Sequence, residues 1–172
     1  IEYMYDYLLG GDGTALLYCP LHNFAAGDLS VVREMMSFPH TVFGLSDAGA
    51  HCAVVCDASF PTTTLALWGG KRRRGDGLPV EFLVHGLSRR NAEQVGWTDR
   101  GLLAPGMLAD VNVIDLSALD CRAPHIVHDL PAGGRRLMQE AVGYRHTIKR
   151  GVVTFNDGKA SGDLPGCLMR GA

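Results

Sequence analysis

Apolar positions in the first half of the chain alternate between short uninterrupted runs and helical spacings. Residues 15–18 and 41–45 form two such runs, and each predicts a strand that is buried on both faces. Between them, apolar side chains recur at helical spacing behind Asp28, a good N-cap residue, and Pro39 ends this predicted helix. The order of strand, helix and strand with short connections is typical of a parallel βαβ unit.

Three further helices are predicted on either side of this unit. Residues 3–9 have the pattern of the end of a helix, which a cluster of glycines stops. One helix is expected within residues 60–68 and another over 79–96, the latter with proline in its first turn and glycine at its end. The link between these two, residues 71–77, is predicted to be a polar loop.

The second half of the chain has the pattern of a β protein. Residues 111–114 predict a strand that follows a turn-rich segment. Residues 146–149 and 152–155 flank Arg150-Gly151, which is a β-hairpin signal, and a further turn is expected at 156–158. The chain is therefore expected to end in antiparallel structure.

The change of pattern near residues 97–101 predicts a boundary between two domains. Residues 1–97 form the α/β part and residues 98–172 form the mostly β part. The fold class predicted from the residues is thus α/β plus β.

Composition narrows the classes of partner. The 172 residues include 16 basic and 18 acidic side chains, a net charge of −2, which argues against nucleic acid and anionic membranes as partners. No apolar run is long enough to span a bilayer, and the start at Ile1 indicates a partial or processed product. An odd number of cysteines without repeated spacing indicates reduced thiols in a cytoplasmic protein; they are Cys19, Cys52, Cys56, Cys121 and Cys167.

Asp47 is the strongest candidate for chemistry. It follows the predicted buried strand 41–45 and lies in a glycine-containing loop, and catalytic side chains of barrel enzymes occupy such positions at the carboxyl ends of strands. A carboxylate there can bind a metal ion or take a proton from metal-bound water. The alternative is a turn or N-cap aspartate, because Ser-Asp-Ala-Gly is favourable turn chemistry.

Other groups of reactive residues favour structural roles. His51, Cys52 and Cys56 are zinc-ligand types, but no second cluster follows them, so packing or a substrate loop is the better interpretation. The basic run Lys71–Arg74 has no interleaved aromatic residues and is interpreted as a solvated loop. The remaining histidines are scattered and are interpreted as surface or core residues.

Several segments together resemble the D-aminoacylase (N-acyl-D-amino-acid deacylase) family of metal-dependent amidohydrolases. Residues 40–52, HTVFGLSDAGAHC, resemble the last barrel strand of that family and its loop. Residues 56–62, 101–113, 128–136 and 164–166 continue the resemblance, which covers nearly the whole chain.

This resemblance implies a fold, a reaction and a site. The fold is the last part of a (β/α)8 barrel over residues 1–97, followed by the carboxy-terminal portion of a β-sandwich over 98–172. The reaction is hydrolysis of the amide of N-acyl-D-amino acids with zinc. By position Asp47 is the general base and a metal ligand, and the substrate loop includes Ser46, Gly49 and His51.

The chain departs from that family in its ligand set. It contains no His-x-His motif, and Asp47 supplies one ligand where a catalytic zinc needs about three. The isolated chain is therefore expected to be inactive, to bind zinc weakly or not at all, and to self-associate or associate with a missing amino-terminal portion. The alternative is a non-catalytic β-rich assembly or binding module that retains an amidohydrolase remnant.

Overall fold

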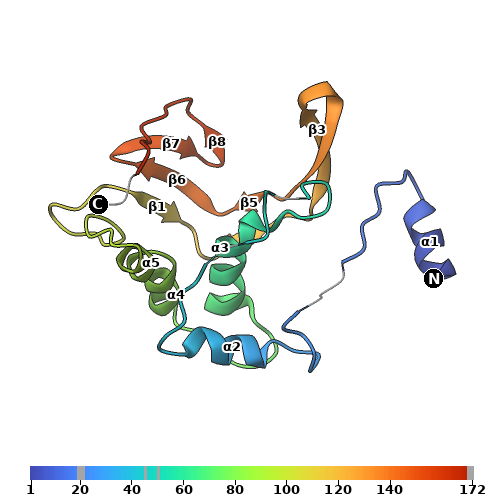
Figure 1. Cartoon of the computed structure of the whole chain (residues 1–172), viewed down its shortest axis with the longest axis horizontal. Helices are drawn as coiled ribbons and strands as arrows, with labels where there is room; N and C mark the ends of the chain where they lie inside the picture. Colours follow the sequence, from blue (N-terminus) through green and yellow to red (C-terminus); the bar gives the residue numbers. More distant parts are fainter. Residues whose placement is uncertain (19–21, 45, 50, 170–172) are drawn as a thin grey trace.

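A computed structural model describes residues 1–18, 22–44, 46–49 and 51–169 of the chain. The first part of the chain is helical and the last part is built from strands (Figure 1). The helical elements are α1 (Glu2–Leu9), α2 (Ser30–Ser37), η1 (Asp57–Ser59), α3 (Phe60–Thr63), the π-helical η2 (Thr64–Lys71), α4 (Val80–Leu87), α5 (Arg89–Gln94) and η3 (Pro131–Gly133).

The strands of the described residues form three antiparallel sheets. They are β1 (Val111–Ile114), β2 (Asp120–Cys121), β3 (His125–Leu130), β4 (Gly134–Met138), β5 (Ala141–Val142), β6 (Tyr144–Lys149), β7 (Val152–Asn156) and β8 (Lys159–Ala160). The largest sheet has the order β1-β6-β7-β8, while β2 pairs with β5 and β3 with β4. The β3–β4 ribbon projects away from the four-stranded sheet (Figure 1).

Local chemistry explains two helix boundaries. The Asp28 carboxylate accepts hydrogen bonds from the backbone N–H of Ser30 at 2.8 Å and from its hydroxyl at 2.6 Å, which fixes the turn from which α2 starts. At Ser88 the backbone leaves helical geometry, with φ −124° and ψ −87°. The single helix predicted over residues 79–96 is therefore wrong in one respect, because α4 and α5 are separate helices.

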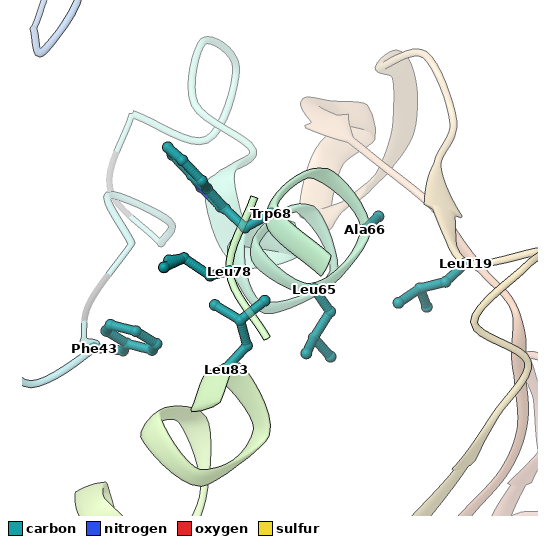
Figure 2. Packing of buried hydrophobic residues seen from close by; sticks show 7 residues of the cluster. All are labelled: Phe43, Leu65, Ala66, Trp68, Leu78, Leu83 and Leu119. Carbon is teal, nitrogen blue, oxygen red and sulfur yellow. The ribbon is translucent and has the colours of Figure 1, made fainter. Parts of the chain in front are cut away.

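The core lies where α3–η2, α4 and the loop that precedes α4 meet. Leu83 of α4 is fully buried, and Trp68 of η2 is 4% exposed. Leu65 of η2 and Leu78, in the loop before α4, belong to the same cluster. Figure 2 shows Leu65 and Leu83 close to one another, with Phe43 on the side of Leu83 and Leu119 pointing in from the β part. Side chains from η2, from α4 and from two distant loop positions, Phe43 and Leu119, thus share one cluster.

Polar contacts join the helices to the strands. The hydroxyl groups of Thr62 and Tyr144 lie 2.8 Å apart, so α3 contacts β6 directly. The Lys71 ammonium donates to the Asp120 carboxylate at 2.7 Å, which ties the end of η2 to β2. These contacts fix the strands next to the helical core.

Helix α1 lies apart from the other helices (Figure 1). None of its residues is buried, and large side chains such as Tyr3, Tyr5 and Leu9 are exposed. Its position matches the helix predicted over residues 3–9. None of the helices in the described ranges is long and apolar enough to cross a membrane.

The two buried strands predicted from apolar runs are wrong. Residues 15–18 and 41–44 have no strand pairing, and Leu45 falls outside the described residues. An apolar run becomes a strand only when a neighbouring strand takes up its backbone hydrogen bonds. Here the carbonyl of Phe43 accepts a hydrogen bond from the side chain of Asn91 instead.

Other predicted elements are confirmed. A helix begins at Phe60 and continues into η2, a strand occupies Val111–Ile114, and the hairpin around Arg150-Gly151 forms as β6 and β7. The assignment to a barrel end and a β-sandwich stays a prediction, as does the division into residues 1–97 and 98–172.

Candidate functional site

The segment that leads to Asp47 is anchored at Phe43. Phe43 is 9% exposed, and its ring packs edge-to-face on Phe82, with ring centroids 5.9 Å apart. It also lies against Gly86, where an added Cβ would come within 2.6 Å of the ring. The Asn91 amide donates to the Phe43 carbonyl oxygen at 2.6 Å. The backbone four residues before Asp47 is thereby fixed to α4 and α5.

The predicted site residues lie on one exposed loop. Asp47 is exposed at a bend, Ser46 is half-buried, and Gly49 and His51 are exposed. Gly49 has φ +103°, a conformation that favours glycine, and His51 has φ +48°. The His51 carbonyl accepts hydrogen bonds from the backbone N–H groups of residues 54 and 55 at 2.8 and 3.1 Å. The structure thus leaves Asp47, Gly49 and His51 exposed to solvent, and a hydrogen-bonded turn follows at His51.

The far end of this loop is tied to the strands. The N–H of Leu137 in β4 donates to the Cys52 carbonyl at 2.7 Å. The Ser59 hydroxyl, just after the loop, donates to the side-chain oxygen of Gln139. Burial, with help from Asp57 and Cys121, raises the pKa of the Cys56 thiol above its usual value.

The residues around Asp47 do not by themselves fit a zinc ion. Within the described residues, no three His, Cys, Asp or Glu side chains come together in a way that could hold a metal. A catalytic zinc takes about three protein ligands. If Asp47 is a zinc ligand, the other ligands must therefore come from outside the described residues.

Two aspartates of the motifs that carry the resemblance serve the β part. Asp110 accepts hydrogen bonds from the Lys149 ammonium at 2.5 Å and from the backbone N–H of Arg150 at 2.9 Å. Burial raises the pKa of Asp110, but these donors together outweigh it and hold that pKa below its usual value. Asp129 receives two hydrogen bonds from the Arg136 guanidinium, at 2.7 and 2.6 Å, and this lowers its pKa. Both aspartates stabilise strand connections.

The family model described as the amidohydrolase family matches residues 12–155. The chain belongs to the amidohydrolase family. The match begins after α1 and extends to β7, so this amidohydrolase segment includes the Asp47 loop and the four-stranded sheet up to that strand. Neither the search of curated proteins nor the search of solved structures found a match.

Membership of the amidohydrolase family indicates a hydrolase-type function. It supports the superfamily named by the resemblance, whereas the D-aminoacylase branch stays a proposal. Sequence reasoning missed the residues that hold this amidohydrolase loop, namely Asn91, Leu137 and Gln139. Leu137 donates through its backbone N–H, so the type of its side chain gives no indication of this contact. Asn91 and Gln139 contact the loop through their side chains, but both are far from Asp47 in sequence.

Proposed function

We propose that the chain contributes to amide hydrolysis of N-acyl-D-amino acids in a metal-dependent amidohydrolase, with Asp47 as the proton acceptor. The observation that carries this proposal is the family match across the loop that holds Asp47. The exposed carboxylate, on a loop fixed at Phe43 and at Cys52, gives it a geometric basis. The run of residues 128–136 favours the D-aminoacylase branch over related cyclic-amide hydrolases.

In the proposed reaction Asp47 takes a proton from the attacking water. The water oxygen forms a bond to the amide carbon, and the bond from that carbon to nitrogen breaks. The proton passes to the leaving nitrogen, which gives a carboxylic acid and a free D-amino acid. A general base of this kind is worth about 10²–10⁴-fold in rate. Ser46, Gly49 and His51 would line the approach of the substrate.

Zinc is part of the proposal for the complete site only. When bound, it would supply Lewis-acid polarisation of the amide carbonyl and lower the pKa of water. We propose that its further ligands come from polypeptide outside the 172 residues. The isolated chain is then inactive and binds zinc weakly.

The non-catalytic alternative is favoured by a different observation. Strands β1 and β8 are the outer strands of the four-stranded sheet, and outer strands present backbone groups that can pair with another chain. Under this alternative the β part is an assembly module.

Zinc content and turnover of the purified chain separate these possibilities. We expect no hydrolysis of an N-acetyl-D-amino acid by the 172 residues alone. Chelator-sensitive turnover by this chain would show that it contains a complete site. A longer protein that contains these residues and a His-x-His motif is expected to cleave the D enantiomer and to spare the L enantiomer. Absence of amidase activity in that longer protein would leave the assembly module as the better account.

Asp47→Asn tests the assigned role within the longer protein. The amide keeps the shape of the carboxylate but cannot take a proton near neutral pH. Turnover is expected to fall about 10²–10⁴-fold, with an unchanged unfolding midpoint. The matched control is Asp57→Asn, an exposed aspartate ten positions later that the proposal gives no chemical role. Zinc content measured beside turnover distinguishes a base from a ligand, because a lost ligand also lowers zinc content. Near-normal turnover of Asp47→Asn would mean that Asp47 is only a turn residue.

A further inference from the structure

An open cavity of about 570 Å³ lies between α2 and the loop of residues 72–77. The helix contributes two serine hydroxyls, Arg33 and Glu34, and the loop contributes Arg72, Gly75 and Asp76. Phe38 and Pro39 also line it. The cavity therefore combines two cations and two carboxylates over a partly apolar floor.

Arg72 lines this cavity, and its guanidinium group contacts an aromatic ring. Its guanidinium carbon lies 4.2 Å from the centroid of the Trp68 ring, and Trp68 is 4% exposed. On another side Gly75 approaches so closely that an added Cβ would lie 3.1 Å from a terminal guanidinium nitrogen. Stacking on an aromatic ring fixes the plane of an arginine. The fork of Arg72 is thus oriented in advance.

The donors of Arg72 have no acceptor among the residues that the structure describes. Its Nε is buried and has no hydrogen-bond partner. No ion pair joins Arg72, Arg33, Glu34 or Asp76 to an opposite charge within the described ranges. The carboxylate of Asp28 is a further nearby charge, and it is occupied by Ser30. The charges that line the cavity are therefore left for a ligand or for water.

The loop that carries Arg72 is closed by three hydrogen bonds. The N–H of Leu78 donates to the Trp68 carbonyl at 2.8 Å, and Nε of Arg33 donates to the Gly77 carbonyl at 3.3 Å. Arg74 donates to the Gly27 carbonyl at 3.4 Å. Arg33 is thereby directed toward the same loop as Arg72, and a ligand would meet groups that are already in place.

We propose that this cavity binds a small zwitterion of the α-amino acid class. A planar carboxylate matches the two parallel N–H donors of a guanidinium, and Arg72 presents such a fork. The ammonium group of the same ligand would meet Glu34 and Asp76. A simple anion such as phosphate is disfavoured, because those two carboxylates would repel it. The inference is independent of the role proposed for Asp47.

Nuclear magnetic resonance of the full 172-residue chain tests the site directly. The buried Nε–H of Arg72 gives a side-chain signal that reports on its own surroundings. Glycine and alanine are expected to shift this signal saturably. Acetate and methylammonium, which carry one charge each, are expected to bind at least about tenfold more weakly, since each forms only one of the two charged contacts. Acetate that binds as tightly as alanine, or no saturable shift with either amino acid, would overturn the proposal.

Variants distinguish a specific binding site from nonspecific attraction by surface charge. Arg72→Lys removes the planar fork and keeps the charge, and binding is expected to weaken about tenfold or more. Arg73→Lys is the matched control on the exposed neighbouring position, and its binding should stay within about twofold. Glu34→Gln, on the exposed face of α2, should weaken binding of amino acids and leave acetate binding unchanged or tighter. Equal losses in Arg72→Lys and Arg73→Lys, or amino-acid binding unchanged in Glu34→Gln, would contradict the assignment.

Discussion

Helix α1 and the helices α3 to α4 all carry large apolar side chains, yet these side chains lie in opposite surroundings. Leu65, Trp68 and Leu83 are buried against one another, whereas every residue of α1 is exposed. Helix α4 also meets Phe43 from the preceding segment, while α1 stands alone in Figure 1. The two regions thus differ in the surfaces that face them.

This difference shows where the stability of the chain resides. A helix of eight residues is marginal in water without a packed face. Burial of apolar surface stabilises the fold by about 25 cal/mol per Å², and α1 gains little of this stabilisation because its residues are exposed. The core around Leu83 is therefore expected to carry the cooperative unfolding transition.

The largest effect is expected for Leu83→Ala. Leu83 is 0% exposed, and a buried leucine cut to alanine costs about 2–5 kcal/mol of unfolding free energy. The matched change in the other region is Leu9→Ala, at 62% exposure, which should cost about 0.5 kcal/mol or less. Urea unfolding followed by circular dichroism measures both. Equal losses would mean that α1 packs as tightly as α4.

Gly86→Ala should rank second. The new methyl group would lie 2.6 Å from the Phe43 ring, and overpacking of this kind costs about 1–3 kcal/mol. Gly44→Ala is the control beside Phe43, because an added Cβ there meets no atom within 4 Å. A shift of the urea midpoint confined to Gly86→Ala is expected. A neutral Gly86→Ala would show that Phe43 moves freely, and the anchor of the Asp47 loop would be lost with it.

Asp110→Asn should produce a smaller effect that depends on pH. The folded pKa of Asp110 is lowered, so its contribution is present above the unfolded pKa, about 3.9, and is lost as pH falls through the folded value. The loss at pH 7 is expected to be about 1 kcal/mol, because solvent screens this half-buried pair. Unfolding at pH 7 and at pH 2 measures it, and the difference between the variant and the parent should shrink at pH 2. Asp6→Asn, on the exposed helix α1, should change neither. A constant loss at both pH values would mean that Asp110 acts by packing rather than by charge.

The sequence predicted local structure well and tertiary pairing poorly. The hairpin at Arg150-Gly151 depends on turn residues and alternation, which adjacent positions carry. The apolar runs at 15–18 and 41–44 could form strands only beside neighbouring strands, and a local sequence pattern does not show whether such neighbours exist. For the candidate site, motif resemblance located the Asp47 loop, and the family match spans it. The hydrogen bonds that Asn91 and Leu137 donate to the ends of this loop could be identified only in the folded structure.

The central position of β6 has a consequence for the order of assembly. It pairs with β7 across a two-residue turn and with β1 across the whole of residues 115–143. A hairpin closes in about 1–10 μs, while a pairing between distant segments waits for a long loop to close. We expect β6 and β7 to form a template on which β1 docks later. Pulsed hydrogen exchange during refolding should protect amides of β7 before those of β1, and the reverse order would show that the sheet is nucleated from the helical side.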